Sequence, residues 1–160
     1  MTTSITNRPA PRWLRELAHG RAAYEELLGW PVSVRVSGRA LVLATGPAAS
    51  AVVMPAALGA LVRKELCVAM QRVPILSDSD GGRWTFLIRP PESLRPGVGG
   101  ELAEADVVLA PPGGYVVVPT SPAGRQWVEP PLPTRGLPPA YPVIAVTRRL
   151  TARRHLVLGA

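Results

Sequence analysis

Two aspartates, Asp78 and Asp80, stand one residue apart directly after an apolar run. Residues i and i+2 of a strand point to the same face, so this pair could chelate a divalent cation, as nucleotidyl transfer requires. Asp-Ser-Asp-Gly is also good turn chemistry, because aspartate side chains accept hydrogen bonds from nearby backbone amides. A Mg²⁺ or Mn²⁺ site at Asp78 and Asp80 therefore competes with a polar turn. We favour the turn, since no histidine or third acid has a spacing that completes the site.

Basic residues are the second feature that could do chemistry. The chain of 160 residues has a net charge of +7, and Lys64 is the only lysine among its 18 basic residues. This arginine bias, with abundant Ala, Gly and Pro, is typical of a GC-rich genome. A basic surface nevertheless favours polyanionic partners. We predict contacts to nucleotide or nucleic acid from Arg35 and Arg83, on the polar faces of strands, and from Arg148 and Arg149 near the C-terminus.

Several other chemistries lack their motifs. The chain contains no G-x-x-x-x-G-K-S/T phosphate loop, no G-x-G-x-x-G fingerprint and no G-x-S-x-G elbow. Its one cysteine, Cys67, excludes an internal disulfide, and its place in a helical apolar pattern predicts a buried side chain. The N-terminal residues lack a signal peptide's apolar segment, and no apolar run is long enough to span a bilayer. We therefore expect no membrane partner and a cytoplasmic location.

The elements that must position these residues are short, because 19 prolines interrupt the chain. Apolar residues at helical spacing predict a helix from about Pro11 to Leu28, with an interruption or kink at Gly20, and a second helix from Pro55. Alternating or apolar runs predict strands. The predicted strands are 32–37, 41–44, 51–55, 73–77, 83–89, 107–110 and 115–119, with the last two paired as a hairpin.

These elements predict an α+β fold, in which a mostly antiparallel or mixed sheet carries two or three packed helices. One domain would cover residues 1–147, beginning with a frayed arm at 1–10. It would include a proline-rich strap at 129–142. A short strand or the start of a helix would follow the strap at 143–146. A basic C-terminal tail would cover residues 148–160.

The order of the elements resembles the N-terminal domain of bifunctional DNA primase/polymerases, the prim-pol family. The resemblance covers about residues 21–131. The segments that resemble the family are AAYEELLGWPV (22–32), LATG (43–46), GGRWTFL (81–87) and ADVVLAPPGGYVVVPTS (105–121). The last of these is similar to the family's glycine-rich hairpin and is the most specific.

The sequence departs from the family pattern at the residues that carry the family's catalytic chemistry. The resemblance implies metal-binding acids on the strand after LATG, where this chain has Met54 and Ala56, and a phosphate-contacting histidine where it has Trp84. We therefore expect a prim-pol-like domain that binds nucleotide or nucleic acid without catalysis and needs no cofactor. Two alternatives stay open. One is an active metal-dependent primase/polymerase that uses Asp78 and Asp80, and the other is a protein-interaction module that uses the strap as a polyproline II ligand.

Overall fold

The computed structural model describes residues 8–124, 126–133 and 136–159. Most of the predicted N-terminal arm, residues 1–7, lies outside this range, as do residues 134–135 of the strap. The helices are α1 (Arg12–Leu28), α2 (Ala56–Val68), α3 (Val98–Glu104) and α4 (Ala140–Leu158). The strands are β1 (Val32–Arg35), β2 (Ala40–Ala44), β3 (Ser50–Pro55), β4 (Ile75–Ser77), β5 (Arg83–Ile88), β6 (Val108–Leu109), β7 (Tyr115–Val118) and β8 (Trp127–Glu129).

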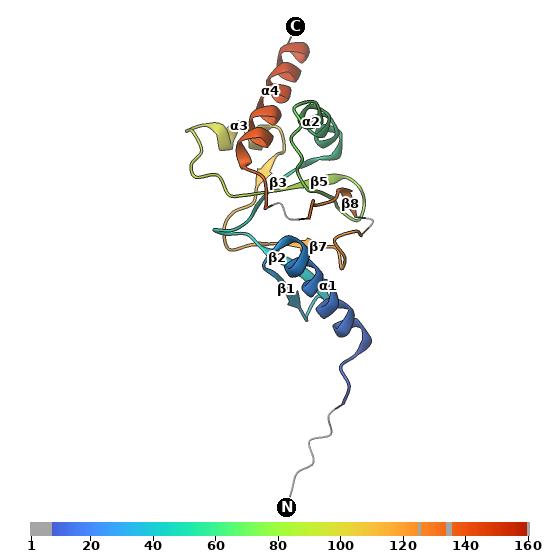
Figure 1. Cartoon of the computed structure of the whole chain (residues 1–160). Coiled ribbons are helices and arrows are strands. Elements are labelled where there is room, and N and C mark those ends of the chain that lie inside the picture. Colours follow the sequence, from blue (N-terminus) through green and yellow to red (C-terminus); the bar gives the residue numbers. More distant parts are fainter. Residues whose placement is uncertain (1–7, 125, 134–135, 160) are drawn as a thin grey trace, which may run out of the picture.

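The strands form two antiparallel sheets (Figure 1). The small sheet has the order β1-β2-β7 and the large sheet the order β6-β3-β5-β4-β8. The predicted α+β class is confirmed. The expectation of one sheet with two or three helices is corrected, since the described residues form two sheets and four helices.

The two faces of the large sheet pack into different cores. Side chains of α2, α3 and α4 cover one face, in a core that includes Val52, Phe86 and Ile144. The other face meets α1 and the small sheet, in a core that includes Ala51, Leu87 and Tyr24. The alternation along β5 explains this division, because residues i and i+2 of a strand share a face. As predicted, Trp84, Phe86 and Ile88 lie on the same side of β5.

Helix α1 runs through Gly20 and approaches the small sheet closely there. A Cβ atom at Gly20 would lie 2.1 Å from the carbonyl oxygen of Thr120. One turn further on, the buried hydroxyl of Tyr24 donates a hydrogen bond of 2.8 Å to the carbonyl oxygen of Pro119. Burial raises the pKa of this hydroxyl far above its ordinary value. The glycine therefore lets α1 and the chain after β7 meet at backbone distance.

The predicted hairpin of residues 107–110 and 115–119 is wrong in its pairing. Strand β6 pairs with β3 of the large sheet, whereas β7 pairs with β2 of the small sheet. Thr45 holds the connection between them, since its hydroxyl donates to the carbonyl oxygen of Pro111 at 2.7 Å and accepts from the amide of Gly114 at 3.0 Å. The segment therefore bridges the two sheets.

The C-terminal region also differs from the prediction. Residues 148–158, predicted as a basic tail, continue α4, which begins at Ala140 within the predicted strap. Pro142 is tolerated in the first turn of this helix because amides there have no intrahelical acceptor. The N-terminal half of α4 buries Val143 and Ile144, while the end of the helix projects from the body (Figure 1).

Some of the described residues of the proline-rich strap pack within the protein, whereas Pro130, Pro133, Gly136 and Pro139 are exposed. Leu137 is buried in the core between the sheets, and the carbonyl oxygen of Pro138 accepts a hydrogen bond of 2.8 Å from the amide of Arg89. Pro131 is also buried. These contacts are those of an internal connection at residues 131, 137 and 138.

Two smaller expectations have different outcomes. Cys67 is exposed, contrary to the predicted buried position, because it lies on the face of α2 that points away from the core. Within the described residues, no helix combines the length and apolar character that crossing a membrane requires.

Candidate functional site

Asp78 and Asp80 form a turn between β4 and β5. The Asp78 carboxylate accepts a hydrogen bond of 3.1 Å from the amide of Arg83, and the Asp80 carboxylate accepts one of 2.8 Å from the amide of Gly82. The bond from Gly82 is the main reason why the pKa of Asp80 lies below its ordinary value. Both side chains thus cap backbone amides, as the turn hypothesis predicts.

The residues at the positions where the resemblance implies a catalytic centre lie together. Met54 and Trp84 are direct partners in the antiparallel pair of β3 and β5. Met54 is fully buried, and Trp84 packs so closely on α2 that a Cβ atom at Gly59 would lie 2.9 Å from its ring. Apolar packing therefore occupies this place. In the part of the chain that the structure describes, no cluster of three or more His, Cys, Asp or Glu side chains could hold a metal ion.

The four arginines predicted to contact phosphates are not gathered at one site. Arg35, at the end of β1, lies 4.4 Å from the centre of the Tyr115 ring in a cation–π contact. Arg83, at the start of β5, donates to the Asp106 carboxylate at 2.8 Å and to the Asp106 carbonyl oxygen at 2.9 Å. Arg83 therefore links β5 to the turn that precedes β6.

The other two predicted arginines anchor α4. Arg148 donates two hydrogen bonds to Glu101 of α3, at 2.6 and 3.1 Å, and Arg149 donates one of 2.7 Å to Glu65 of α2. The bonds from Arg148 hold the pKa of Glu101 below its ordinary value. The same bonds raise the pKa of Arg148, so the ion pair stabilises the charged form of each of its two side chains.

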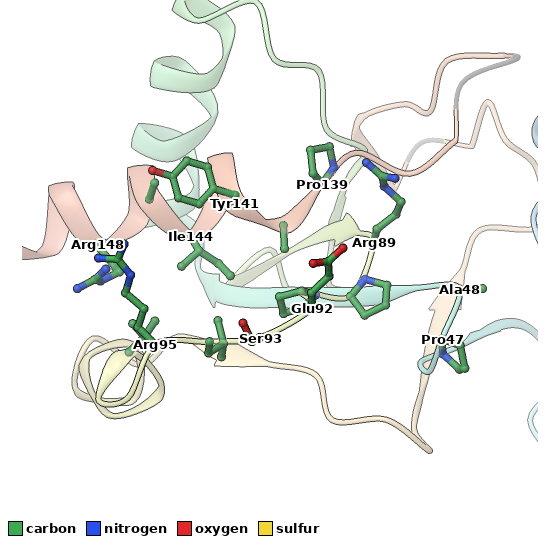
Figure 2. A pocket seen from close by; sticks show the side chains of 16 residues that line it. Pro47, Ala48, Arg89, Glu92, Ser93, Arg95, Pro139, Tyr141, Ile144 and Arg148 are labelled. Carbon is green, nitrogen blue, oxygen red and sulfur yellow. The ribbon is translucent and has the colours of Figure 1, made fainter.

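A groove of about 940 Å³ lies between α4 and the connection from β5 to α3. One wall is a face of α4 that carries Tyr141, Ile144 and Arg148, as Figure 2 shows. The opposite wall is the segment Arg89-Pro-Pro-Glu-Ser-Leu-Arg95. Arg148 is the one residue of the four predicted arginines that lines this groove.

Both ends of the loop that forms the opposite wall are attached to the fold. At its start, the amide of Arg89 donates to the strap at Pro138. At its end, the carbonyl oxygen of Arg95 accepts a hydrogen bond of 3.2 Å from the amide of Val98, whose side chain is buried in the core. The positive φ of 87° at Gly97 turns the chain into α3, a conformation that favours glycine. The arginines of this wall therefore stand on a backbone fixed at both ends.

The groove carries an excess of positive charge. Three arginines line it against one acid, Glu92. Arg89 and Arg95 are exposed, and across residues 8–124, 126–133 and 136–159 neither takes part in an ion pair. In Figure 2, Arg89 stands at one end of the groove, with Arg95 and Arg148 at the other. Exposed guanidinium groups at two places along a groove can bind an anion that carries more than one phosphate.

Sequence reasoning missed Arg89 and Arg95. Arg89 was predicted as the last residue of the strand at 83–89, and no element or site was assigned to Arg95, although the stretch RPPESLRP has an arginine near each end. This spacing was the available signal, because prolines between two arginines keep them apart. On the opposite wall, Arg148 was predicted as a phosphate contact, but only a short strand or helix start at 143–146 was predicted where α4 lies.

Comparisons of this chain with protein-family models, with curated proteins and with solved structures found no significant match.

Proposed function

We propose that this protein is a non-catalytic domain that binds nucleic acid or nucleotide and serves DNA metabolism or its regulation. The observation that carries the proposal is the groove beside α4, where Arg89 and Arg95 have no carboxylate partner among the described residues. Arginine fits such ligands because its planar guanidinium group can donate two parallel hydrogen bonds to one phosphate.

Two further observations support the proposal. The resemblance to prim-pol domains associates the chain with nucleotides, although a likeness of fold does not by itself give a function. The positions where that family has its metal ligands and histidine hold Met54, Ala56 and Trp84, and the Met54 side chain is buried. A hard cation needs oxygen ligands, which these side chains do not have.

Binding should depend on the groove arginines. Fluorescence anisotropy with a labelled single-stranded oligonucleotide at low salt would measure the affinity of the intact chain. We expect Arg89→Ala/Arg95→Ala to weaken binding by about a hundredfold or more, because two charge-assisted contacts are lost, each worth about 1.5 kcal/mol or more.

The control removes the same charge elsewhere. Arg15→Ala/Arg21→Ala changes two exposed arginines of α1, which packs on the small sheet away from the groove (Figure 1). This variant should lose much less affinity. An equal loss in both double variants, or no binding by the unchanged protein, would contradict the proposal.

A further inference from the structure

An exposed aromatic ring stands on the wall of the groove. Tyr141 lies in the first turn of α4 and is 79% exposed. It is seven residues before Arg148, and both line the groove (Figure 2). Residues seven apart share a helix face, and the helical rise of 1.5 Å separates them by about 10 Å along the axis. The ring of Tyr141 and the guanidinium group of Arg148 therefore lie on the same wall of the groove, where one ligand can contact both.

The rest of the groove suits the same kind of ligand. Ile144 and Ala145 lie between Tyr141 and Arg148 on the helix, and Pro90 and Pro91 face them from the loop. Apolar side chains thus line the middle of the groove together with Glu92 and Ser93, and arginines stand near its ends. Proteins that hold single-stranded nucleic acid combine these two features, since bases stack on aromatic rings while cationic side chains contact the backbone.

The groove is separate from the position where the prim-pol resemblance implies a catalytic centre. That position lies at the Met54–Trp84 pair, whereas Arg89 follows Ile88 at the opposite end of β5. The packing of Trp84 on Gly59 closes the first position, while the second is open. A ligand in the groove is therefore not placed for chemistry at the first position.

We infer that the groove takes an unpaired nucleotide, with its base stacked on Tyr141 and its phosphates at Arg95, which stands at the same end of the groove as Arg148. This inference rests on the proposed function and adds to it a preference for single-stranded over double-stranded nucleic acid. In a duplex, each base is stacked and paired inside the helix, so the ring of Tyr141 has no free base face to cover. A free nucleoside triphosphate and a single strand share the required chemistry.

The test compares variants at Tyr141 in competition assays. A labelled single-stranded oligonucleotide is displaced by the unlabelled strand, by its duplex, by a nucleoside triphosphate or by inorganic tripolyphosphate. We expect Tyr141→Ala to weaken binding of the single strand by about fivefold or more, and Tyr141→Phe to keep it, because stacking needs the ring and not the hydroxyl. Binding of tripolyphosphate should not change, since it has no base.

The control is Tyr115→Ala, which removes another exposed ring, located on the small sheet. This variant should bind like the unchanged protein. The nucleoside triphosphate distinguishes a site for one nucleotide from a site that needs a longer strand. At a site for one nucleotide, the nucleoside triphosphate should compete as well as the unlabelled oligonucleotide does.

Four results would overturn the inference. If the duplex competes as well as the single strand, or if Tyr141→Ala has no effect, the groove binds phosphates alone and the proposed function stands without the base. If Tyr141→Ala weakens tripolyphosphate equally, the ring only supports the groove. If the unchanged protein binds none of the four ligands, the proposed function and this inference both fail.

Discussion

At the scale of single residues, the arginines differ in what holds them. Arg83 and Arg148 each donate two hydrogen bonds to one acidic residue, at Asp106 and Glu101. Arg89 and Arg95 have no such partner within the described part of the chain. An arginine held by a carboxylate must exchange that partner for a phosphate, whereas an unpaired one binds without this loss. Phosphate binding should therefore depend most on Arg89 and Arg95.

Gly20 gives a prediction about stability at the same scale. Alanine is the better helix former by about 1 kcal/mol, but its Cβ atom at this position would stand 2.1 Å from a backbone oxygen that cannot rotate away. We expect Gly20→Ala to lower the free energy of unfolding by about 1–3 kcal/mol, as overpacking does. Urea denaturation followed by circular dichroism would measure it.

Gly99 of α3 is the matched control for this substitution. It is also a helical glycine, and a Cβ atom there would meet no atom within 4 Å. Gly99→Ala should leave stability unchanged or raise it, because only the helix propensity changes. If both variants were equally stable, α1 and the Thr120 backbone would not meet as closely as the structure has them.

At the scale of elements, α4 has two unequal halves. Its N-terminal half packs on the core of the large sheet and lines the groove, while its residues from Ala152 to Leu158 are all exposed. Arg148 and Arg149 lie where the packed half ends, and their ion pairs to α3 and α2 fix the helix there. The position of the groove wall thus depends on contacts between elements that are distant in sequence.

The ion pair between α3 and α4 predicts a dependence of stability on pH. Arg148 lowers the pKa of Glu101 below its ordinary value of 4.5. At a pH above 4.5 the carboxylate is ionised in both states, and the pair contributes fully. As the pH falls below 4.5, the unfolded chain binds the proton more readily, so the contribution declines and is lost below the folded-state pKa.

We therefore expect Glu101→Gln to be less stable than the unchanged protein at pH 6 and to lose this difference progressively as the pH falls below 4.5. Urea midpoints measured across this range would show it. The size should be small, since the pair is exposed and screened by salt. Glu104→Gln, which changes an exposed acid on the same short helix, serves as the control. A gap that stayed constant with pH would refute the role of the ion pair.

At the scale of the whole molecule, the net charge of +7 gives a long-range attraction for polyanions, and the groove is their proposed binding site. Binding through phosphates releases counterions, so its strength must fall with salt. For single strands, the slope of log affinity against log salt is about −0.7 per phosphate contact. Contacts at Arg89, Arg95 and Arg148 would give a slope of about −2.

The salt titration separates local contacts from general attraction. We expect Arg89→Ala/Arg95→Ala to reduce the slope to about −0.7, because one of three phosphate contacts remains. The α1 double variant should keep the slope of the unchanged protein. A slope that is equally steep in both double variants would mean that phosphates lie elsewhere on the surface.

The sequence by itself determined the elements whose signals are local. The alternation of β5, the apolar face of α2 and the Asp78–Asp80 turn each depend on neighbouring residues, and the structure contains all three. The α+β class follows from their order. Local signals suffice here because hydrogen bonds within a turn or a helix join residues that are only a few positions apart.

Only the tertiary structure decided the pairing of β6 and β7, the full length of α4 and the groove. The apolar pattern of residues 107–119 is the same whether these strands pair with each other or with two different sheets, because periodicity does not identify a partner. Because Pro138, Pro139 and Pro142 argue against a helix, the sequence did not indicate where α4 begins. Tertiary contacts stabilise the packed half of this helix. The groove joins residues near 48, 90 and 145, which become neighbours only when α4 packs on the large sheet.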